Sequence, residues 1–190
     1  MAAVLAVTHP PSPADAFVGR LVAAAVAQTT QAVRYDGSYR RIPYPGGDVP
    51  ADVGVCTDVV IRAYRAVGVD LQQSVHEDMA RAFEAYPRAW GLSRPDANID
   101  HRRVPNLQTY FERRGVEVVA TRDPRDYAAG DLVTWMLPGN LPHIGLVTDR
   151  RSADGERPLV VHNIGNGPEI EDMLFAFPIT GHYRYRGESR

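Results

Sequence analysis

The 190-residue chain has no lysine, a single cysteine and no long apolar stretch. All of its basic side chains are arginine, which we interpret as a compositional habit and not as a functional signal. A single cysteine excludes an internal disulfide and a zinc site built from several cysteines. No apolar run approaches the roughly 20 residues that a membrane-spanning helix needs, so we expect no membrane span.

Excess charge is also absent, since the net charge is only −2 at neutral pH. Such a balance gives no electrostatic reason to expect nucleic acid as a partner. Hydrophobic residues make up 44% of the chain, which is enough for one core, and no repeat or low-complexity linker divides it. We therefore expect a flexible N-terminus over residues 1–11 and a single domain over residues 12–190.

The spacing of apolar residues changes from helical to strand-like along the chain. Helix-start signals stand at residues 12–15, 56–58, 74–77 and 105, each ahead of an apolar stripe. From residue 116 the pattern favours strands, at residues 116–120, 131–137, 143–148, 159–164, 173–177 and 181–185. Helices followed by an antiparallel meander indicate an α+β fold, with N-terminal helices packed on an antiparallel sheet of about five to six strands.

The single cysteine is the strongest candidate for chemistry. A Gly/Pro-rich segment over residues 43–55 leads to Cys56, which stands in the first turn of a predicted helix. Unpaired backbone N–H groups and the helix dipole stabilise a thiolate at that place. Most lone cysteines are small buried side chains, so a catalytic interpretation requires a base and an orienting group elsewhere in the chain.

Two histidines are candidates for these roles. His143 opens one predicted strand and His162 lies inside the next, so a hairpin would bring both side chains to one face. We assign Cys56 as nucleophile, His143 as general base and His162 as the group that orients it. Asn163 is a weaker candidate for orientation, because alternation points it the other way, and it joins the substrate-binding candidates. The oxyanion would be met by the Cys56 backbone N–H and by Tyr44.

A metal site is the alternative for the same side chains. Cys56, His143 and His162 form a permissible three-ligand set for zinc with an open fourth position. The sequence lacks the close ligand pairs, such as His-x-x-x-His or Cys-x-x-Cys, that zinc sites usually contain. We therefore favour thiol chemistry and expect neither a metal nor another cofactor.

Three blocks of sequence occur in a familiar order. Residues 44–47 (Tyr-Pro-Gly-Gly) precede residues 52–58 (Asp-Val-Gly-Val-Cys-Thr-Asp), residues 129–133 (Ala-Gly-Asp-Leu-Val) precede residues 142–147 (Pro-His-Ile-Gly-Leu-Val), and residues 161–163 (Val-His-Asn) follow. These blocks resemble the Tyr-x-x-Gly-Gly … Asp-Cys-Ser-Gly, Pro-Gly-Asp-Leu-Val … His-Val-Gly-Ile and third-polar-residue blocks of the NlpC-type cell-wall cysteine peptidases. The chain looks closest to a family of uncharacterised bacterial envelope proteins within that superfamily.

The resemblance implies a papain-like fold and an enzyme of the bacterial envelope, periplasmic or secreted. It implies hydrolysis of an amide bond in the peptidoglycan stem peptide, by an endopeptidase or an amidase. The segment from Leu71 is longer than the family core needs, so a helical insertion is expected around residues 71–115. Peptidoglycan is then the expected partner, and an inhibitor or immunity protein would join it if the protein is a secreted toxin.

Departures from the family pattern leave alternatives open. Asp58 stands where the family has glycine, and it would either bind a substrate amine or raise the pKa of the thiol. Arg102 and Arg103 are candidates for binding a substrate carboxylate in a bidentate fork, against the alternative of a surface cluster that pairs internally. A peptidoglycan-binding module without turnover and a thiol acyltransferase are the alternative functions.

Overall fold

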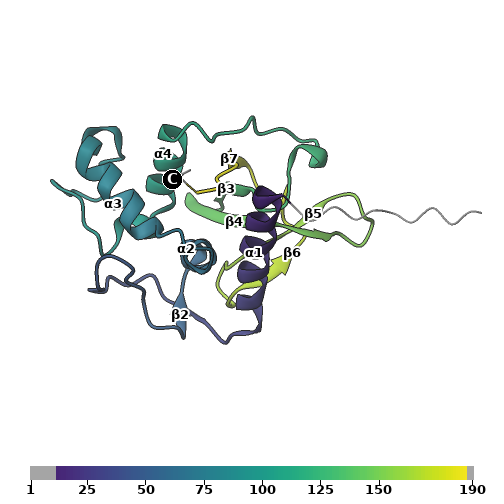
Figure 1. Cartoon of the computed structure of the whole chain (residues 1–190), viewed down its shortest axis with the longest axis horizontal. Helices are drawn as coiled ribbons and strands as arrows, with labels where there is room; N and C mark the ends of the chain where they lie inside the picture. Colours follow the sequence, from purple (N-terminus) through teal and green to yellow (C-terminus); the bar gives the residue numbers. More distant parts are fainter. Residues whose placement is uncertain (1–11, 188–190) are drawn as a thin grey trace, which may run out of the picture.

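The structure is a computed structural model that describes residues 12–187, so the predicted flexible N-terminus lies outside the described residues. Within this range four α-helices come first and a five-stranded sheet follows (Figure 1). The helices are α1 (Pro13–Ala27), α2 (Cys56–Ala66), α3 (Leu71–Ala82) and α4 (Val104–Arg113), with short 3₁₀ turns η1 (Gln28–Thr30), η2 (Phe83–Ala85), η3 (Asp100–Arg102) and η4 (Pro124–Asp126). None of the helices within residues 12–187 is long and apolar enough to cross a membrane.

The predicted helix starts have one error. Ser12 caps α1 by accepting a hydrogen bond from the Asp15 N–H, and Pro13 occupies the first helical position, as the sequence predicts. The start of α3 is predicted one turn too late, at the Ser74–Glu77 capping box. Asp70 is the actual N-cap, because its carboxylate accepts hydrogen bonds from the N–H groups of both residues 72 and 73.

The sheet is antiparallel throughout, in the order β6-β5-β4-β3-β7. Its strands are β3 (Leu132–Leu137), β4 (Leu141–Arg151), β5 (Pro158–His162), β6 (Glu169–Glu171) and β7 (Ile179–Tyr183). Ahead of α2, the two-residue strands β1 (Arg34–Tyr35) and β2 (Val53–Gly54) pair in parallel. The expected α+β class with an antiparallel sheet is confirmed.

Two predicted strands are wrong. Residues 116–120 form only a single bridge, from Glu117 to Tyr183 of β7. Residues 173–177 form turns that place Met173 and Leu174 against the sheet. The true edge strand β6 was missed because it is short and carries glutamates on both sides of one isoleucine.

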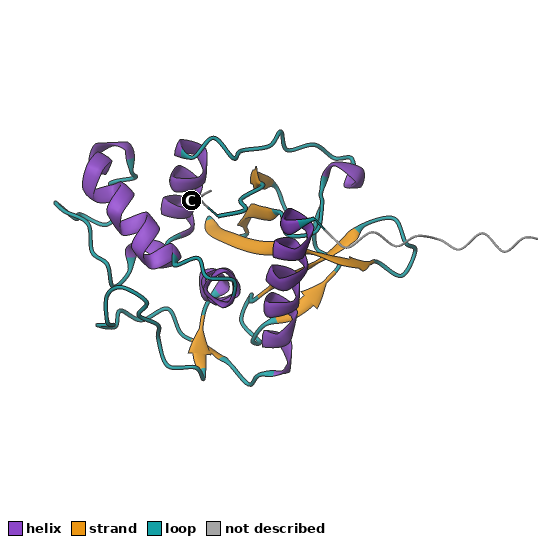
Figure 2. Cartoon of the chain, viewed as in Figure 1, coloured by secondary structure: helices purple, strands orange, loops and turns teal. Residues whose placement is uncertain are grey.

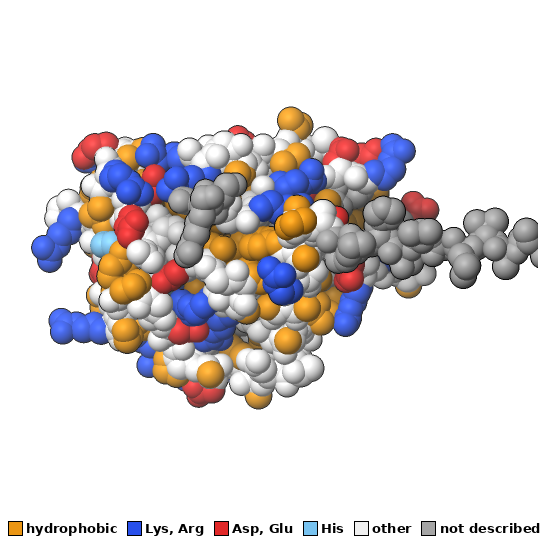
Figure 3. Space-filling view, in the orientation of Figure 1, with side chains coloured by type: hydrophobic (Ala, Val, Ile, Leu, Met, Phe, Trp, Pro, Cys, Tyr) orange, Lys and Arg blue, Asp and Glu red, His pale blue; other side chains and the backbone are white. Residues whose placement is uncertain are grey.

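The helices lie on one face of the sheet, where α1, α2 and α4 contact β4 (Figure 2). The larger core lies between them and includes Leu132, Ile144, Leu146, Val161 and Tyr183 from the sheet. A smaller core covers the opposite face and consists of Tyr127, Val133, Trp135, Val147, Val160, Met173 and Leu174. Arginine side chains are spread over the face of the molecule in Figure 3 and do not gather in one patch.

Candidate active site

The cysteine at the start of α2 is buried against the sheet. Strand β2 leads into α2, so Val55 is the N-cap and Cys56 is the first helical residue. Cys56 is only 5% exposed, and its thiol hydrogen-bonds with the backbone of Ile144 in β4. The thiol therefore reaches the β4 backbone one residue away from His143.

Burial decides the protonation state of this thiol. It raises the pKa of Cys56 to about 11, with the negative charge of Asp58 acting in the same direction and backbone hydrogen bonds from Ile144 and Thr57 opposing both. The sequence predicts that the helix N-terminus favours the thiolate. The structure shows that loss of water outweighs that effect, so the resting protein holds a neutral thiol at pH 7.

Asp58 and Arg102 form a buried ion pair beside the thiol. Arg102 donates from Nε to Asp58 Oδ1 (2.8 Å) and from Nη2 to Oδ2 (2.9 Å), and both side chains are 2% exposed. Asp58 Oδ2 also accepts a hydrogen bond from the Val55 N–H (2.7 Å), which caps the helix. Asp58 and Arg102, which the sequence predicts as substrate contacts, form an ion pair with each other and fix the start of α2.

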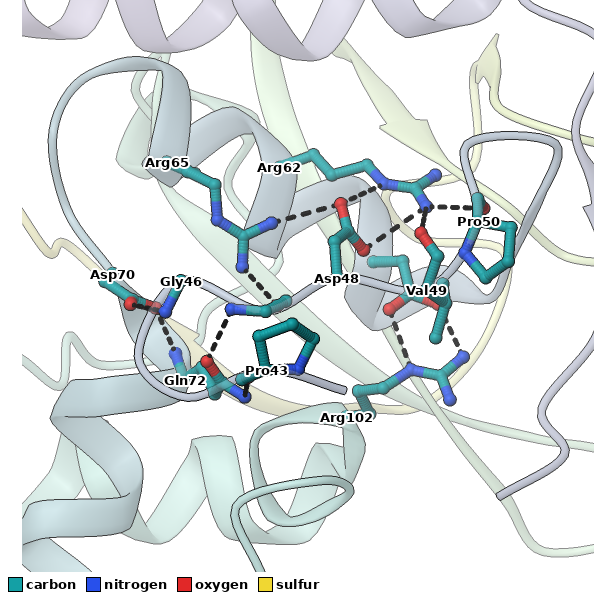
Figure 4. A network of polar contacts seen from close by, with 12 residues as sticks. Pro43, Gly46, Asp48, Val49, Pro50, Arg62, Arg65, Asp70, Gln72 and Arg102 are labelled. Carbon is teal, nitrogen blue, oxygen red and sulfur yellow. Dashed lines mark hydrogen bonds and ion pairs between the residues drawn. The ribbon is translucent and has the colours of Figure 1, made fainter. Parts of the chain in front are cut away.

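Polar contacts also hold the Gly/Pro-rich loop in front of α2 (Figure 4). Two arginines of α2 share Asp48, with Arg62 Nε and Arg65 Nη1 each 3.0 Å from its Oδ2. Arg62 Nη2 additionally donates to the carbonyl oxygens of Val49, Pro50 and Val53. The loop that precedes the cysteine is therefore bound to the same helix that begins with it.

The glycine pair at residues 46–47 is bound to α3. The Gly46 N–H donates to Asp70 (2.6 Å) and the Gly47 N–H donates to Gln72 (2.8 Å). A side chain at Gly47 would overlap the carbonyl oxygen of Pro43, so this position requires glycine. The Gly-Gly motif thus has a packing reason that is independent of catalysis.

Tyr44, the predicted oxyanion donor, packs on α3, whereas the electrostatic interaction with the thiol involves Tyr35. The Tyr44 ring packs edge-on against His76 of α3, at 4.9 Å between ring centroids. Tyr35 lies opposite Gly54 in the β1–β2 pair, and Gly54 is two residues before Cys56 in the sequence. Burial and the charges of Cys56 and Asp58 raise the pKa of Tyr35, so it is this tyrosine that senses the thiol. Sequence reasoning missed it, because β1 has no apolar pattern.

The two predicted histidines do meet, and a third side chain extends the contact. His143 Nε2 lies 3.1 Å from His162 Nδ1, and His162 Nε2 lies 2.9 Å from Glu171 Oε2. Both rings are buried, whereas the Glu171 side chain is 47% exposed. Gly145 makes the approach of β5 possible, since a Cβ there would lie 2.6 Å from Val160 Cγ1 and 3.0 Å from the Val161 carbonyl oxygen. Glu171 was not predicted, because β6 was not.

This chain of contacts fixes the proton positions of both rings. Burial lowers the pKa of His143 to about 3, with the charge of His162 acting in the same direction, and burial also lowers the pKa of His162. Both rings are therefore neutral at pH 7. A carboxylate only accepts, so His162 donates from Nε2 to Glu171 and accepts at Nδ1 from His143 Nε2. His143 Nδ1 is left as an acceptor, as a general base requires.

The Cys56 thiol and the His143 ring lie on opposite faces of the sheet at β4. Cys56 belongs to the core under the helices, whereas His143 lies opposite Trp135, which is part of the smaller core. Within residues 12–187, no hydrogen bond joins the Cys56 thiol to the His143 ring. The predicted contact between nucleophile and base is therefore absent from this conformation.

Asn163 lies just beyond β5 and is completely buried. Val161 faces the helices, so alternation turns Asn163 to the side from which Cys56 approaches. Asn163 Oδ1 accepts a hydrogen bond from the Gly165 N–H (3.0 Å), while its Nδ2 has no acceptor in the described part of the chain. Buried donors normally have a partner, so this amide is available to an oxygen atom of a ligand.

Arg103 differs from its neighbour Arg102. Its guanidinium lies over the exposed ring of Trp90, at 4.1 Å from the centroid, and is 3.3 Å from Asp100 Oδ1. The side chain is partly exposed, with its positive charge at the surface. A contact of Arg103 with a substrate carboxylate stays a prediction.

Residues 22–185 match the family described as a domain of unknown function, DUF1287. This chain belongs to the DUF1287 family. It is similar to the "Uncharacterized protein YijF" of Escherichia coli (strain K12), with 56% identity over 151 residues, which are 80% of this chain and 73% of that protein. The DUF1287 match spans Tyr35, Cys56, both histidines and Glu171, so the whole candidate site lies within the family domain.

Proposed function

We propose that this DUF1287 protein is a cysteine hydrolase of the bacterial envelope, periplasmic or secreted, that cleaves an amide bond in peptidoglycan stem peptides. The three blocks that resemble NlpC-type peptidases suggest the papain-like fold, the substrate and the endopeptidase or amidase activity. One observation carries the proposal. The thiol at the start of α2 interacts with the backbone of Ile144, the residue after His143, and His143 is hydrogen-bonded to His162, which in turn contacts Glu171.

The neutral thiol and neutral imidazole favour a general-base mechanism. When the side chains come together, His143 Nδ1 takes the thiol proton while Cys56 Sγ attacks the carbonyl carbon of the substrate. Catalytic hydrogen bonds often form only in the substrate complex. His143 then gives the proton to the leaving amine, and a water molecule that His143 activates hydrolyses the thioester. The proton chain to Glu171 keeps Nδ1 as the accepting atom.

Two donors are suited to the negative oxygen of the tetrahedral intermediate. The Cys56 backbone N–H lies at the start of α2, where helix N–H groups have no intrahelical acceptor. Asn163 Nδ2 is a buried donor without an acceptor among residues 12–187, on the side of the sheet that Cys56 approaches. Asn163 therefore replaces Tyr44 in our proposal, since Tyr44 packs on α3.

The proposal is tested with purified muropeptides and mass spectrometry of the products. We expect cleavage of a stem-peptide amide by the full-length protein, no cleavage by Cys56→Ala, and turnover lower by about 10²–10⁴-fold in His143→Ala. Glu156→Gln, at an exposed position in the turn between β4 and β5, is the control variant and should cleave normally. Absence of cleavage by the wild type, or equal cleavage by Cys56→Ala, would contradict the proposal.

A binding module without turnover is the second candidate, and one observation favours it. The thiol is protonated, buried and not hydrogen-bonded to His143 within the described residues. Sedimentation with purified sacculi distinguishes the two functions, since a binding module would pellet with them and release no fragments. A thiol acyltransferase would instead give a conjugate when an amine acceptor is added, in place of the hydrolysed product.

A further inference from the structure

The hairpin of β5 and β6 brings three metal-binding side chains together. Register places His162 directly opposite Glu169, and Glu171 follows two residues later on the same face of β6. The nearest ligand atoms of these three side chains all lie within 4.8 Å of one another. The histidine is buried and the glutamates reach outward from the edge strand, so the group opens to solvent on one side.

The two glutamates lack a permanent counter-charge. Within residues 12–187 neither Glu169 nor Glu171 forms an ion pair with an arginine, and the polar contact of Glu171 is to His162. The two carboxylates share a small space, so their negative charges repel one another. A cation between them would remove this repulsion.

The donor set suits zinc. Imidazole nitrogen and carboxylate oxygen are both zinc ligands, and three protein ligands with an open fourth position form a tetrahedral Zn²⁺ site. At bond lengths of about 2.0–2.2 Å the donors lie about 3.4 Å apart, so the partly buried Glu169 and the exposed Glu171 would move inward to close the remaining gap. The other nitrogen of His162 is hydrogen-bonded to His143, as the second nitrogen of a metal-bound histidine usually is.

We propose that His162, Glu169 and Glu171 bind a Zn²⁺ ion, and that this ion blocks the thiol chemistry by moving the ring protons. With zinc on Nε2 of His162, the proton of that ring sits on Nδ1 and is donated to His143 Nε2. The proton of His143 must then sit on Nδ1, the atom that has to accept from Cys56. In each ring the single proton moves from Nε2 to Nδ1, so no proton is gained or lost. The inhibition rests on the proposed hydrolase function, whereas the metal binding does not.

Calorimetric titration of the full chain with zinc chloride tests the binding. We expect one site in the wild type and in Cys56→Ala, and an affinity at least tenfold weaker in Glu169→Gln. Glu156→Gln, an exposed glutamate in the turn between β4 and β5, is the matched control and should bind as the wild type does. Equal binding by Glu169→Gln, loss of binding in Cys56→Ala, or tighter binding of magnesium than zinc would overturn the proposed site.

Two further measurements separate the metal site from the switch. Long-range ¹H–¹⁵N correlation spectra should show the proton of His162 on Nε2 without zinc and on Nδ1 with zinc; unchanged tautomers would overturn the switch. Muropeptide cleavage should fall at least tenfold when the wild type is saturated with zinc, while Glu169→Gln keeps its activity at the same concentration. If zinc binds and moves the protons but the wild type never cleaves, the hydrolase proposal fails and the metal site stands.

Discussion

Buried polar groups are arranged differently at the start of α2 and in the chain of contacts from His143 through His162 to Glu171. At the start of α2, Asp58 and Arg102 form a buried ion pair with each other, and Arg62 and Arg65 bind the loop that precedes Cys56. The chain from His143 to Glu171 is hydrogen-bonded as well, but it ends at the Glu171 side chain, which is exposed to solvent. The first region fixes positions, and the second is where chemistry can respond to a substrate or an ion.

The largest effect is expected at His143. His143→Ala removes the proposed base, which contributes about 10²–10⁴-fold to the rate of reactions of this kind. Muropeptide turnover should fall by that factor, while the free energy of unfolding from urea titration changes much less than it does for substitutions in the Asp58–Arg102 pair. If His143→Ala lost as much stability as the Asp58 or Arg102 variants, the two regions would not differ in the way described.

Asp58→Ala should act mainly on stability. It leaves the Arg102 guanidinium buried without its carboxylate, and breaking a buried pair in this way costs about 3–5 kcal/mol. The change is measured by urea unfolding followed by circular dichroism. Replacement of both partners, Asp58→Leu with Arg102→Met, should recover much of the loss, since no uncompensated charge remains. A loss below about 1 kcal/mol for Asp58→Ala would contradict the assigned role.

The buried thiol predicts a loss of stability in alkali. The pKa of Cys56 rises from an ordinary value of 9.0 to about 11, so the unfolded chain releases this proton at lower pH than the folded chain does. The thiol should therefore lower the free energy of unfolding by about 2 kcal/mol as the pH rises from 9 to 11. Cys56→Ser does not titrate in this range and should lose about 2 kcal/mol less than the wild type. Identical pH profiles would show that the thiol is not buried as described.

The smallest effect is expected at Glu171. Glu171→Gln keeps a hydrogen-bond acceptor for His162 but removes the negative charge that fixes the tautomer, so turnover should fall by about tenfold. Because the amide can also donate, the pH dependence of turnover should shift as well. The free energy of unfolding should change by less than about 0.5 kcal/mol, since the side chain lies at the surface. Full activity in this variant would show that Glu171 has no role in orienting His162 and His143.

The sequence predicted the elements with a strong period and missed those that depend on distant partners. Helices α1, α2 and α4 follow their caps and apolar stripes, and β3, β4, β5 and β7 follow alternation. β6 was missed because three residues carry too little pattern, and with it Glu171. The false strand at residues 173–177 is apolar because it covers the second face of the sheet as a turn.

The candidate site shows the same limit. His143 and His162 were predicted to share a face, because a hairpin and alternation require only local information. The pairing of Asp58 with Arg102 joins residues 44 positions apart, and no local pattern indicates it. Burial of the thiol is also a tertiary property, which is why the expected thiolate is a neutral thiol. Likewise, the position of Tyr35 near the start of α2 depends on how β1 pairs with β2.

The central claim is that Cys56 forms a covalent bond with a peptidoglycan stem peptide. Acid quenching of the reaction during turnover, followed by mass spectrometry of the intact protein and of its peptides, measures this directly. We predict that the wild type gains the mass of the acyl fragment on the peptide that contains Cys56, and that Cys56→Ala gains none. Cleavage of the stem peptide without an adduct on Cys56, at an equal rate in Cys56→Ala, would contradict the account.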